Sequence, residues 1–400
     1  MKFNRSPKSL LLTSIVFALG ASTTVVVSGA GAAKITSLTC YQADATRFNA
    51  LQHPLKKPVQ VAGVNAVCPQ GFTPNKYVNI SGMTLNVADT QGFYQLLWGT
   101  GVLKGVVNPS KLGFNVHFDE LSGPGIISAV INGADHVTPV VSTASWAEAL
   151  DAGQSLSAVG INQLVNPGNY WQVIVSPAQY AAGTTSAANL AGLKIAYPAG
   201  DDSQYVVDSL LRKNHIALNN YTYSNLSEAN ALAALAGGSV QAIVVSPIVA
   251  AQAQAMGNKV IASGVGILNG YSPILMTPSA TKNPKTMAMV AAYLYQGALI
   301  DKWILNNQTA FTQVIFNAFF AASPATNGPV GQALSAILYN TGINRFLPIS
   351  KSIKNEVQAE ALSLYYDGIL QNSPKVLSWF NPVFERELTY LNTLIGPASK

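Results

Sequence analysis

The side chains best placed for binding chemistry lie in short polar runs that directly follow predicted strands. Ser142 and Thr143 come after the apolar segment 137–141 and open a predicted helix through residue 150. Hydroxyl groups at such a position lie beside the free backbone N–H groups of the helix start, and both kinds of donor point the same way. Asp201, Asp202 and Ser203 open another predicted helix after the strand 193–197. Each run could contact a small ligand or serve only as a helix cap.

Signatures of catalysis are absent from the sequence. It contains no G-x-S-x-G nucleophile elbow, phosphate-binding loop, G-x-G-x-x-G fingerprint or H-E-x-x-H helix. The histidines are far apart along the chain, which argues against a metal site: His53, His117, His136 and His215. We therefore predict no catalytic residue, no metal and no cofactor.

Length and composition limit the class of protein. A chain of 400 residues is long enough for two or three domains and for a cleft between lobes. Apolar residues make up 49% and charged residues only 10%, so the surface must consist largely of uncharged polar residues. The net charge of +6 includes three basic residues at the N-terminus, and no basic stripe occurs elsewhere. We predict no nucleic-acid partner.

The N-terminus has the layout of a secretory signal. Lys2, Arg5 and Lys8 precede the apolar stretch 10–27, and the small residues 28–33 follow. This pattern predicts a signal peptide over residues 1–33, cleaved after Ala32 or Ala33, and hence an exported protein. An uncleaved anchor is the alternative, because the apolar stretch is just long enough to span a bilayer.

The two cysteines, Cys40 and Cys68, bracket a proline-rich loop. In an oxidising compartment such an even pair predicts one disulfide, which would stabilise the fold by about 3.5 kcal/mol on the chain-entropy model. A catalytic or metal-binding role is the alternative, although no histidine or carboxylate lies near either cysteine in sequence.

Carboxylates are scarce, with 17 in the whole chain. Acid unfolding proceeds mainly by protonation of Asp and Glu residues whose folded-state pKa is depressed, and this chain has few of them to protonate. The composition therefore suggests that the protein faces an acidic exterior.

Hydrophobic periodicity predicts a strand, a polar turn and a helix three times in succession. The strands are expected at 83–88, 113–118 and 137–141. The helices are expected at 93–104, from the turn 122–125 through 131, and at 142–150. This order predicts a mainly parallel sheet whose polar turns gather at the carboxyl ends of the strands, where open sheets bind ligands. A second unit has strands expected at 170–176, 193–197, 221–223, 240–245 and 259–262, and residues beyond 272 form one strand followed largely by helix.

Several segments resemble one family of transport proteins. The run 190–200, LAGLKIAYPAG, resembles the "dLkGkkiavp.Gs" segment of the extracytoplasmic solute-binding proteins of nitrate, taurine, aliphatic-sulfonate and thiamine-pyrimidine ABC importers. Residues 229–243 are similar to the family's "aal.sGdvDa" step, and residues 126–135 to the counterpart of that step in the first lobe. Ser246-Pro247 resembles its "Wdp" turn and 282–284 its "kenPe" helix start. The likeness extends over residues 83–310.

This resemblance implies an α/β, two-lobed type II periplasmic-binding-protein fold, in which each lobe is a mainly parallel sheet flanked by helices. Lobe 1 would comprise residues 83–174 and 272–400 and lobe 2 residues 175–271, with crossovers near 172–176 and 271–275. Hinge closure around a ligand is the expected motion. The segment 34–82 would be a loop-rich extension.

The resemblance also implies the function. A monomer in the periplasm, or on the outer face of the cytoplasmic membrane, would capture a small sulfonate-, nitrate- or taurine-like solute and deliver it to an ABC permease. The alternative is a secreted enzyme or sensor on the same scaffold, such as a desulfinase-like hydrolase. Such desulfinases place a catalytic Cys near the first strand, and the turn at Thr90 has none.

The turns that face the cleft in this architecture supply the candidate ligand-binding residues. They are Thr90, Gln91, Gly92, Phe93, Gly123, Pro124, Ser142, Thr143, Asp201, Asp202, Ser203, Tyr205 and Ser246. Each could instead be an ordinary turn, cap or core residue.

One of these turns departs from the family. Asp201 and Asp202 occupy positions where the family commonly has Ser or Thr, and two ionised carboxylates would repel an anion. The solute is then neutral or carries an amine, or an acidic medium protonates one Asp, or both carboxylates point to solvent.

Overall fold

The computed structural model describes residues 80, 82–90, 114–121, 124–164, 168, 170–317, 321, 328, 331–332, 335 and 344–395, and the backbone of four short strands before them. These strands are β1 (Ser37–Tyr41), β2 (Val59–Val61), β3 (Val64–Val67) and β4 (Lys76–Tyr77), in the order β2-β3-β1-β4. The predicted signal peptide, the helix expected at 93–104 and Cys68 lie outside the described residues.

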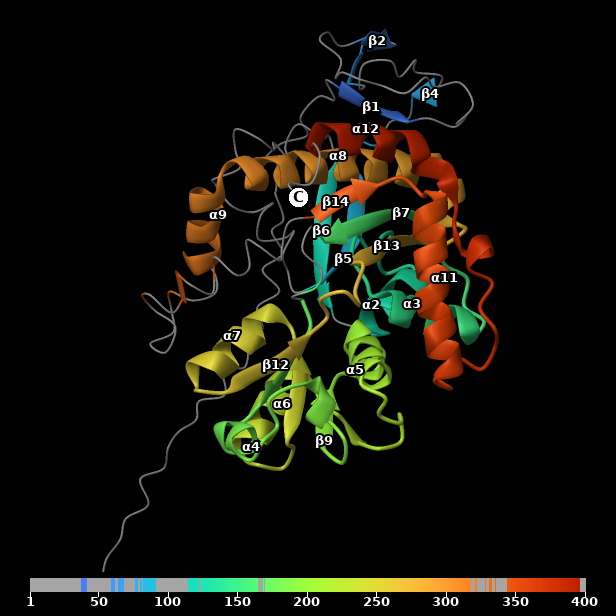
Figure 1. Cartoon of the computed structure of the whole chain (residues 1–400). Helices are drawn as coiled ribbons and strands as arrows, with labels where there is room; N and C mark the ends of the chain where they lie inside the picture. The colour runs from blue at the N-terminus through green and yellow to red at the C-terminus, as the bar shows by residue number, and fades with distance from the viewer. Residues whose placement is uncertain are drawn as a thin grey trace, which may run out of the picture.

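The first lobe, in the upper half of Figure 1, is built on a mixed sheet. Strand β5 (Thr84–Thr90) pairs in parallel with β6 (Asn115–Leu121), and single bridges join Val87 to Val137 and Thr138 to Leu275. Strand β13 (Tyr271–Met276) pairs antiparallel with β7 (Ser157–Leu164), which pairs antiparallel with β14 (Asn344–Leu347). The bridges thus connect the two sets of strands into one layer.

The second lobe has a five-stranded sheet in the order β10-β9-β11-β8-β12. Its strands are β8 (Gln172–Val175), β9 (Lys194–Tyr197), β10 (Thr222–Asn225), β11 (Ala242–Val245) and β12 (Lys259–Ser263). β9 is parallel to β10 and β11, while β8 is antiparallel to both β11 and β12. Four strands therefore share one direction, which confirms the prediction of a mainly parallel sheet.

Helices cover both sheets. Those of the first lobe are α2 (Pro124–Ile131), α3 (Thr143–Asp151), α8 (Pro284–Asn306), α9 (Gln308–Ile315), α11 (Lys351–Tyr366) and α12 (Glu385–Ile395). α8 begins with Asn283 as N-cap and Pro284 as its first residue, an arrangement that suits the free N–H groups of a helix start. It buries residues around much of its circumference, including Met287, Tyr293 and Leu294, so it forms the centre of the first lobe's core.

The second lobe carries α4 (Pro177–Ala181), α5 (Asp202–Lys213), α6 (Glu228–Ala236) and α7 (Pro247–Ala255). α5 shows the spacing of an amphipathic helix, since Val206, Val207, Leu210 and Leu211 are all buried against the sheet. Burial of such a side chain stabilises the fold by about 1.5–3 kcal/mol. Because this apolar face packs on the sheet, α5 has a fixed orientation, and its polar N-terminus lies against the first lobe.

The two connections between the lobes run side by side. The N–H of Leu164 donates to the carbonyl of Gly270 at 3.0 Å, and the N–H of Gly264 donates to the carbonyl of Trp171 at 3.0 Å. A Cβ placed on Gly168 would lie 2.7 Å from Cα of Val265, so only glycine allows this close approach. The crossovers therefore come before β8 and before β13, because each of these strands lies wholly in one sheet.

The segment 34–82, predicted to be loop-rich, contains the strands β1 to β4. Within the two lobes, the sequence analysis missed three further elements. β7 carries Gly160, Asn162 and Gln163, residues with weak strand preference, and it forms because its neighbours bury it. β14 and α4 are short and lie among helical and loop residues. The strand predicted at 137–141 is reduced to two single bridges.

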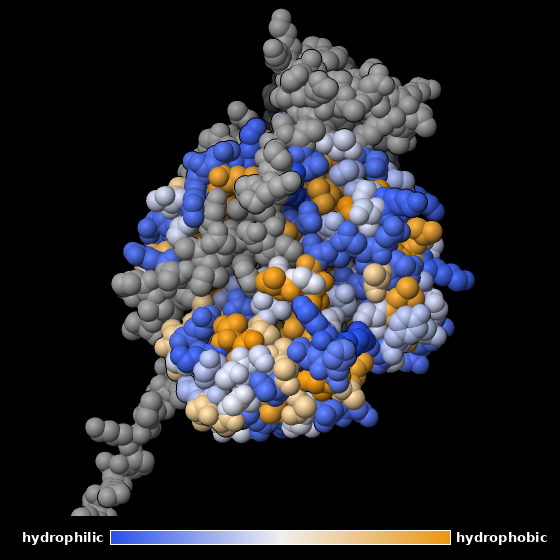
Figure 2. Space-filling model, in the orientation of Figure 1, coloured by the Kyte–Doolittle hydropathy of each residue, from blue (hydrophilic) through white to orange (hydrophobic). Residues whose placement is uncertain are grey.

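Among the described residues, no helix is long and apolar enough to cross a bilayer. Figure 2 shows a mostly hydrophilic face with small separate hydrophobic patches. This agrees with the polar surface that the composition predicts.

Candidate functional site

The junction between the lobes is built from the starts of two helices. α3 of the first lobe begins after Ser142, and α5 of the second lobe begins after Asp201. Figure 1 shows α5 reaching up to α3 and α11 of the first lobe. Because free backbone N–H groups cluster at helix starts, this junction concentrates hydrogen-bond donors from both lobes.

The hydroxyl groups at the start of α3 are all hydrogen-bonded. Ser142 Oγ accepts from the N–H of Ser145 at 3.0 Å and donates to Ser145 Oγ at 2.8 Å. Thr143 is fully buried, and its hydroxyl lies 3.3 Å from the carbonyl of Tyr271. The predicted N-cap is thus confirmed, and the first lobe presents a hydroxyl-rich edge to the second.

The start of α5 depends on a left-handed glycine. Gly200 has φ of +68°, and Asp201 Oδ1 then accepts from the N–H of Asp202 at 2.8 Å. A Cβ placed on Gly200 would lie 3.4 Å from Glu148 Oε2 and 3.6 Å from Pro124 Cγ, both in the first lobe. The turn therefore packs directly between the starts of α2 and α3.

Three contacts cross from one lobe to the other at this point. Ser145 Oγ donates to the carbonyl of Gly200, and the N–H of Ala144 donates to Asp202 Oδ1 at 3.4 Å. The carboxyl groups of Asp202 and Glu360, the latter on α11, also share a hydrogen bond. A carboxylate of the second lobe thus lies at the helix start of the first, the end of the helix dipole that attracts negative charge.

A second carboxylate lies behind the next turn of the second lobe. Glu228, the first residue of α6, accepts from the N–H of Ser246 at 2.8 Å and from its hydroxyl at 2.6 Å. Burial raises the pKa of Glu228, and the two hydrogen bonds from Ser246 oppose that rise. The predicted residue Ser246 therefore holds Glu228 in place.

Burial raises the pKa of the junction carboxyls, because a charged group loses hydration there. It raises the pKa of Asp202 to about 6, and burial followed by the charge of Asp202 raises that of Asp201 well above its ordinary value. Burial also raises the pKa of Glu148 and Glu360. The junction is therefore negative at neutral pH and becomes less so in acid.

The structure brings some predicted residues together and separates others. Pro124, Ser142, Thr143, Asp201 and Asp202 meet around the start of α5. The remaining described candidates have other partners. Ser203 is buried with Oγ 3.4 Å from the carbonyl of Pro198, and Tyr205 lies near Arg212 and Glu360.

The first predicted turn lies largely outside the described residues. Thr90 ends β5, and its side chain is not described; Gln91, Gly92, Phe93 and Gly123 lie outside altogether. Their assignment as ligand-binding residues stays a prediction.

Three carboxylates at the junction were missed by the sequence. Glu228 follows a strand and opens a helix, so the rule that selected Asp201 could have found it. Glu148 lies within α3 and Glu360 within α11, and no local pattern marks either. Glu360 lies far from Asp202 along the chain, since the rest of lobe 2 and much of lobe 1 come between them.

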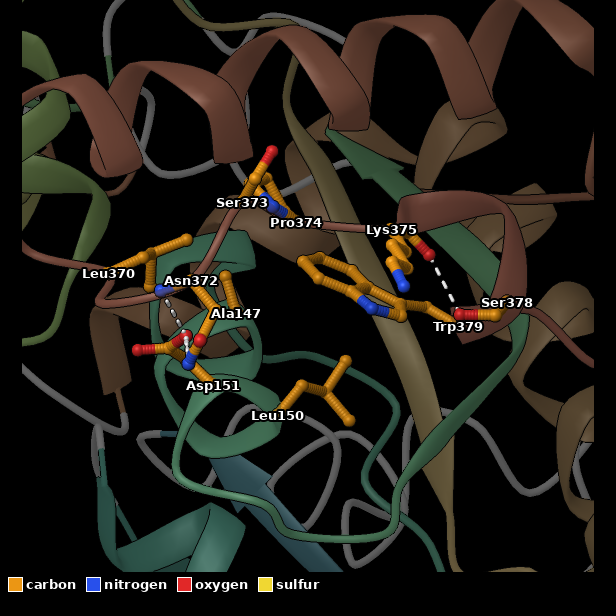
Figure 3. Close-up of a pocket in the computed structure, with 10 residues that line it drawn as sticks. All are labelled: Ala147, Leu150, Asp151, Leu370, Asn372, Ser373, Pro374, Lys375, Ser378 and Trp379. Atoms are coloured by element: carbon orange, nitrogen blue, oxygen red, sulfur yellow. Dashed lines mark hydrogen bonds between the residues drawn. The ribbon is translucent and has the colours of Figure 1, made fainter.

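A pocket of about 330 Å³ lies away from this junction, in the first lobe between α3 and the segment after α11. Figure 3 shows Trp379 and Leu150 on its walls with Asp151 at one end. Asp151 accepts from the N–H groups of Gln371 at 2.6 Å and Asn372 at 2.9 Å, so it fastens this segment to α3. None of the predicted site residues lines the pocket.

Within the described part of the chain, no group of three His, Cys, Asp or Glu side chains is arranged to hold a metal ion. The hydroxyls, backbone N–H groups and carboxyls of the junction suit noncovalent binding of a small polar molecule.

Comparison with known proteins agrees with this arrangement. Residues 123–298 match the family model described as NMT1/THI5 like. This segment is similar to NMT1/THI5-like proteins. It contains the starts of α2, α3, α5 and α6, and therefore most of the junction. No curated protein was found to be similar in sequence.

Solved structures show the same fold. The periplasmic aliphatic sulphonate binding protein SsuA from Escherichia coli aligns with a TM-score of 0.62 at 18% identity, covering 75% of this chain and 92% of that one. The periplasmic nitrate-binding protein NrtA from Synechocystis aligns at 0.53 and 13%, covering 74% and 84%. The desulfurization enzyme DSZB aligns at 0.52 and 16%, covering 78% and 99%. The chain has the two-lobed α/β fold of periplasmic binding proteins, as its sequence predicted.

Proposed function

We propose that this protein is the solute-binding component of an ABC importer. It captures a small solute between its lobes and delivers it to a membrane permease. The observation that carries this proposal is the meeting of the α3 and α5 starts across two lobes joined by two adjacent connections. Two connections of this kind permit hinge closure over a ligand. The nature of SsuA and NrtA as binding proteins supports the same function.

The solute belongs to the sulfonate, nitrate or taurine-like class, and the carboxyls favour a taurine-like one. The ammonium group of a zwitterionic solute would donate hydrogen bonds to the carboxyls of Asp201, Asp202 and Glu228, whereas nitrate has no hydrogen to donate. The sulfonate end of the same solute suits the N–H and hydroxyl donors of α3.

Titration calorimetry with matched solutes tests this function. Taurine and ethanesulfonate differ by one amine, so we expect taurine to bind more tightly and nitrate to bind least. Replacing Ser142→Ala together with Thr143→Ala should weaken binding by about 1–3 kcal/mol if these hydroxyls contact the solute.

The control variant is Ser350→Ala, which removes the N-cap of α11 at the end of that helix remote from Glu360. It should leave solute affinity unchanged. Failure of every solute of these classes to bind would contradict the proposal, and unchanged affinity in the double variant would refute the assignment of Ser142 and Thr143.

A secreted enzyme or sensor is the second candidate, since DSZB shares the fold. The turn that follows β5 contains no cysteine, which argues against covalent desulfination there. Release of sulfite from an aryl sulfinate by the purified protein would favour the enzyme, whereas recovery of intact solute after denaturation favours transport.

The proposal extends to processing and organisation. Export through the signal at 1–33, a disulfide between Cys40 and Cys68, and a monomeric state fit a binding protein outside the cytoplasm. The expected lobe bounds, 83–174 with 272–400 and 175–271, fall inside β8 and β13. Because β8 pairs in the second sheet and β13 in the first, we propose that lobe 2 begins before Gln172 and ends before Tyr271.

A further inference from the structure

The contact between Asp202 and Glu360 joins the lobes through a single proton. Asp202 belongs to α5 of the second lobe, and Glu360 belongs to α11 of the first. Asp202 already accepts from the N–H of Ala144 and also accepts from Glu360. Since two carboxylates have no hydrogen to share, this second bond requires one carboxyl of the pair to be protonated.

The surroundings of Glu360 leave little to stabilise a charge. Glu360 is 4% exposed and its Oε1 has no hydrogen-bond partner, so only a hydrogen bond from the hydroxyl of Thr143 opposes the rise in its pKa. An ionised carboxylate in such a place is costly, whereas a protonated one that donates to Asp202 is satisfied.

The other titratable groups near the pair add mostly negative charge. Asp201, the N-cap of α5, interacts with Asp202, and Glu148 of α3 and Glu228 of α6 interact in turn with Asp201. The phenols of Tyr205 on α5 and Tyr170 before β8 also lie near the pair and are uncharged. The cation nearby is Arg212, whose guanidinium donates to Ser363 Oγ at 2.7 Å and forms an ion pair with Asp367. Arg212 therefore ties α5 to α11 without neutralising the carboxyl pair.

We propose that closure of the two lobes takes up a proton at the Asp202–Glu360 pair, so that solute is held in acidic surroundings and released as the pH rises. This regulation rests on the proposed function as a solute-binding protein. Opening the lobes separates Asp202 from Glu360, exposes both to water and returns each to its ordinary titration range.

The direction of the effect follows from proton linkage. Burial raises the pKa of both carboxyls in the closed form, Asp202 to about 6, relative to their ordinary values of 3.8 and 4.5. Below the ordinary values both forms are protonated and closure is fully favoured. Between the ordinary values and about 6, closure binds an extra proton at each carboxyl, and above about 6 at Glu360 alone. The equilibrium constant for closure therefore falls as pH rises, by about tenfold per pH unit for each extra proton.

Small-angle scattering of the solute-free full chain tests closure directly, because it needs no ligand. We expect the radius of gyration to be smaller at about pH 4.5 than at about pH 8. Glu360→Gln keeps a donor toward Asp202 but cannot ionise, so this variant should stay closed at both pH values. Glu356→Gln, one turn earlier on α11, is the matched control and should behave like the wild type.

An equal radius at both pH values in the wild type would overturn the proposal, as would an unchanged pH transition in Glu360→Gln. If circular dichroism shows that Glu360→Gln does not fold, Asp202→Asn supplies the same test, with a weakened pH transition expected. A pH transition without any solute binding would defeat only the proposed function. Solute binding with pH-independent closure would defeat only this regulation.

Discussion

The two lobes share a topology but use the same position in it differently. In the first lobe, Ser142 follows the third segment of the sheet, and its hydroxyl accepts from the N–H of Ser145 as a helix cap. In the second lobe, Ser246 follows the corresponding strand β11, but its hydroxyl and N–H both donate to Glu228. In the second lobe, the serine therefore does not cap its helix with its side chain but donates two hydrogen bonds to a neighbouring carboxylate.

This difference makes the lobes complementary. The first lobe contributes hydroxyl groups and helix-start N–H groups together with the carboxyls of Glu148 and Glu360, and the second contributes the carboxyls of Asp201, Asp202 and Glu228. Donors facing acceptors explain why the junction forms hydrogen bonds even without a solute. The same arrangement makes the junction sensitive to the protonation of its acceptors.

The largest expected effect concerns the hydrophobic cores of the two lobes, which are separate. Leu211 of α5 and Leu294 of α8 are both fully buried, each in the core of its own lobe. We expect Leu211→Ala and Leu294→Ala each to lower the free energy of unfolding by about 2–5 kcal/mol, because both leave a cavity. Urea unfolding monitored by circular dichroism measures this. A loss below about 1 kcal/mol in one variant would show that its lobe repacks.

The two serines provide a sharper test. Ser246→Ala should lower the free energy of unfolding by about 1–3 kcal/mol, since it removes a hydrogen bond from the carboxylate of Glu228. Ser142→Ala should cost about 1 kcal/mol, the ordinary value of a helix cap. Thermal unfolding of the two variants measures the difference, and a larger cost at Ser142 would reverse the assigned roles.

The smallest expected effect is that of acid on overall stability. The raised pKa values at Asp202, Glu148 and Glu228 contribute stability that is fully present below the unfolded values near 4 and lost as pH rises through the folded values. Asp151 opposes this, since hydrogen bonds from Gln371 and Asn372 lower its pKa.

We therefore expect the free energy of unfolding at about pH 3 to lie within about 1 kcal/mol of that at pH 6, or above it. Urea titrations at the two pH values measure it. A large loss of stability at the lower pH would contradict both this prediction and the idea of an acidic exterior.

The sequence by itself determined the local elements and the helix starts. Polar runs after apolar strands placed Ser142 and Asp201 correctly as N-caps, because capping depends on residues only a few positions apart. The order of strands and helices predicted the mainly parallel sheet of the second lobe, whereas the sheet of the first lobe is mixed because β7 pairs antiparallel with β13 and β14. β7, by contrast, has too little strand preference to be recognised without the neighbours that bury it.

Only the tertiary structure decided the chemistry of the junction. Asp202 and Glu360 lie far apart along the chain, and their shared hydrogen bond exists because α5 and α11 pack together across the lobes. The pKa of a carboxyl depends on hydration and on charges nearby in space, neither of which a local sequence pattern records. The negative character of the junction therefore arises from folding, although each carboxylate is already present in the sequence.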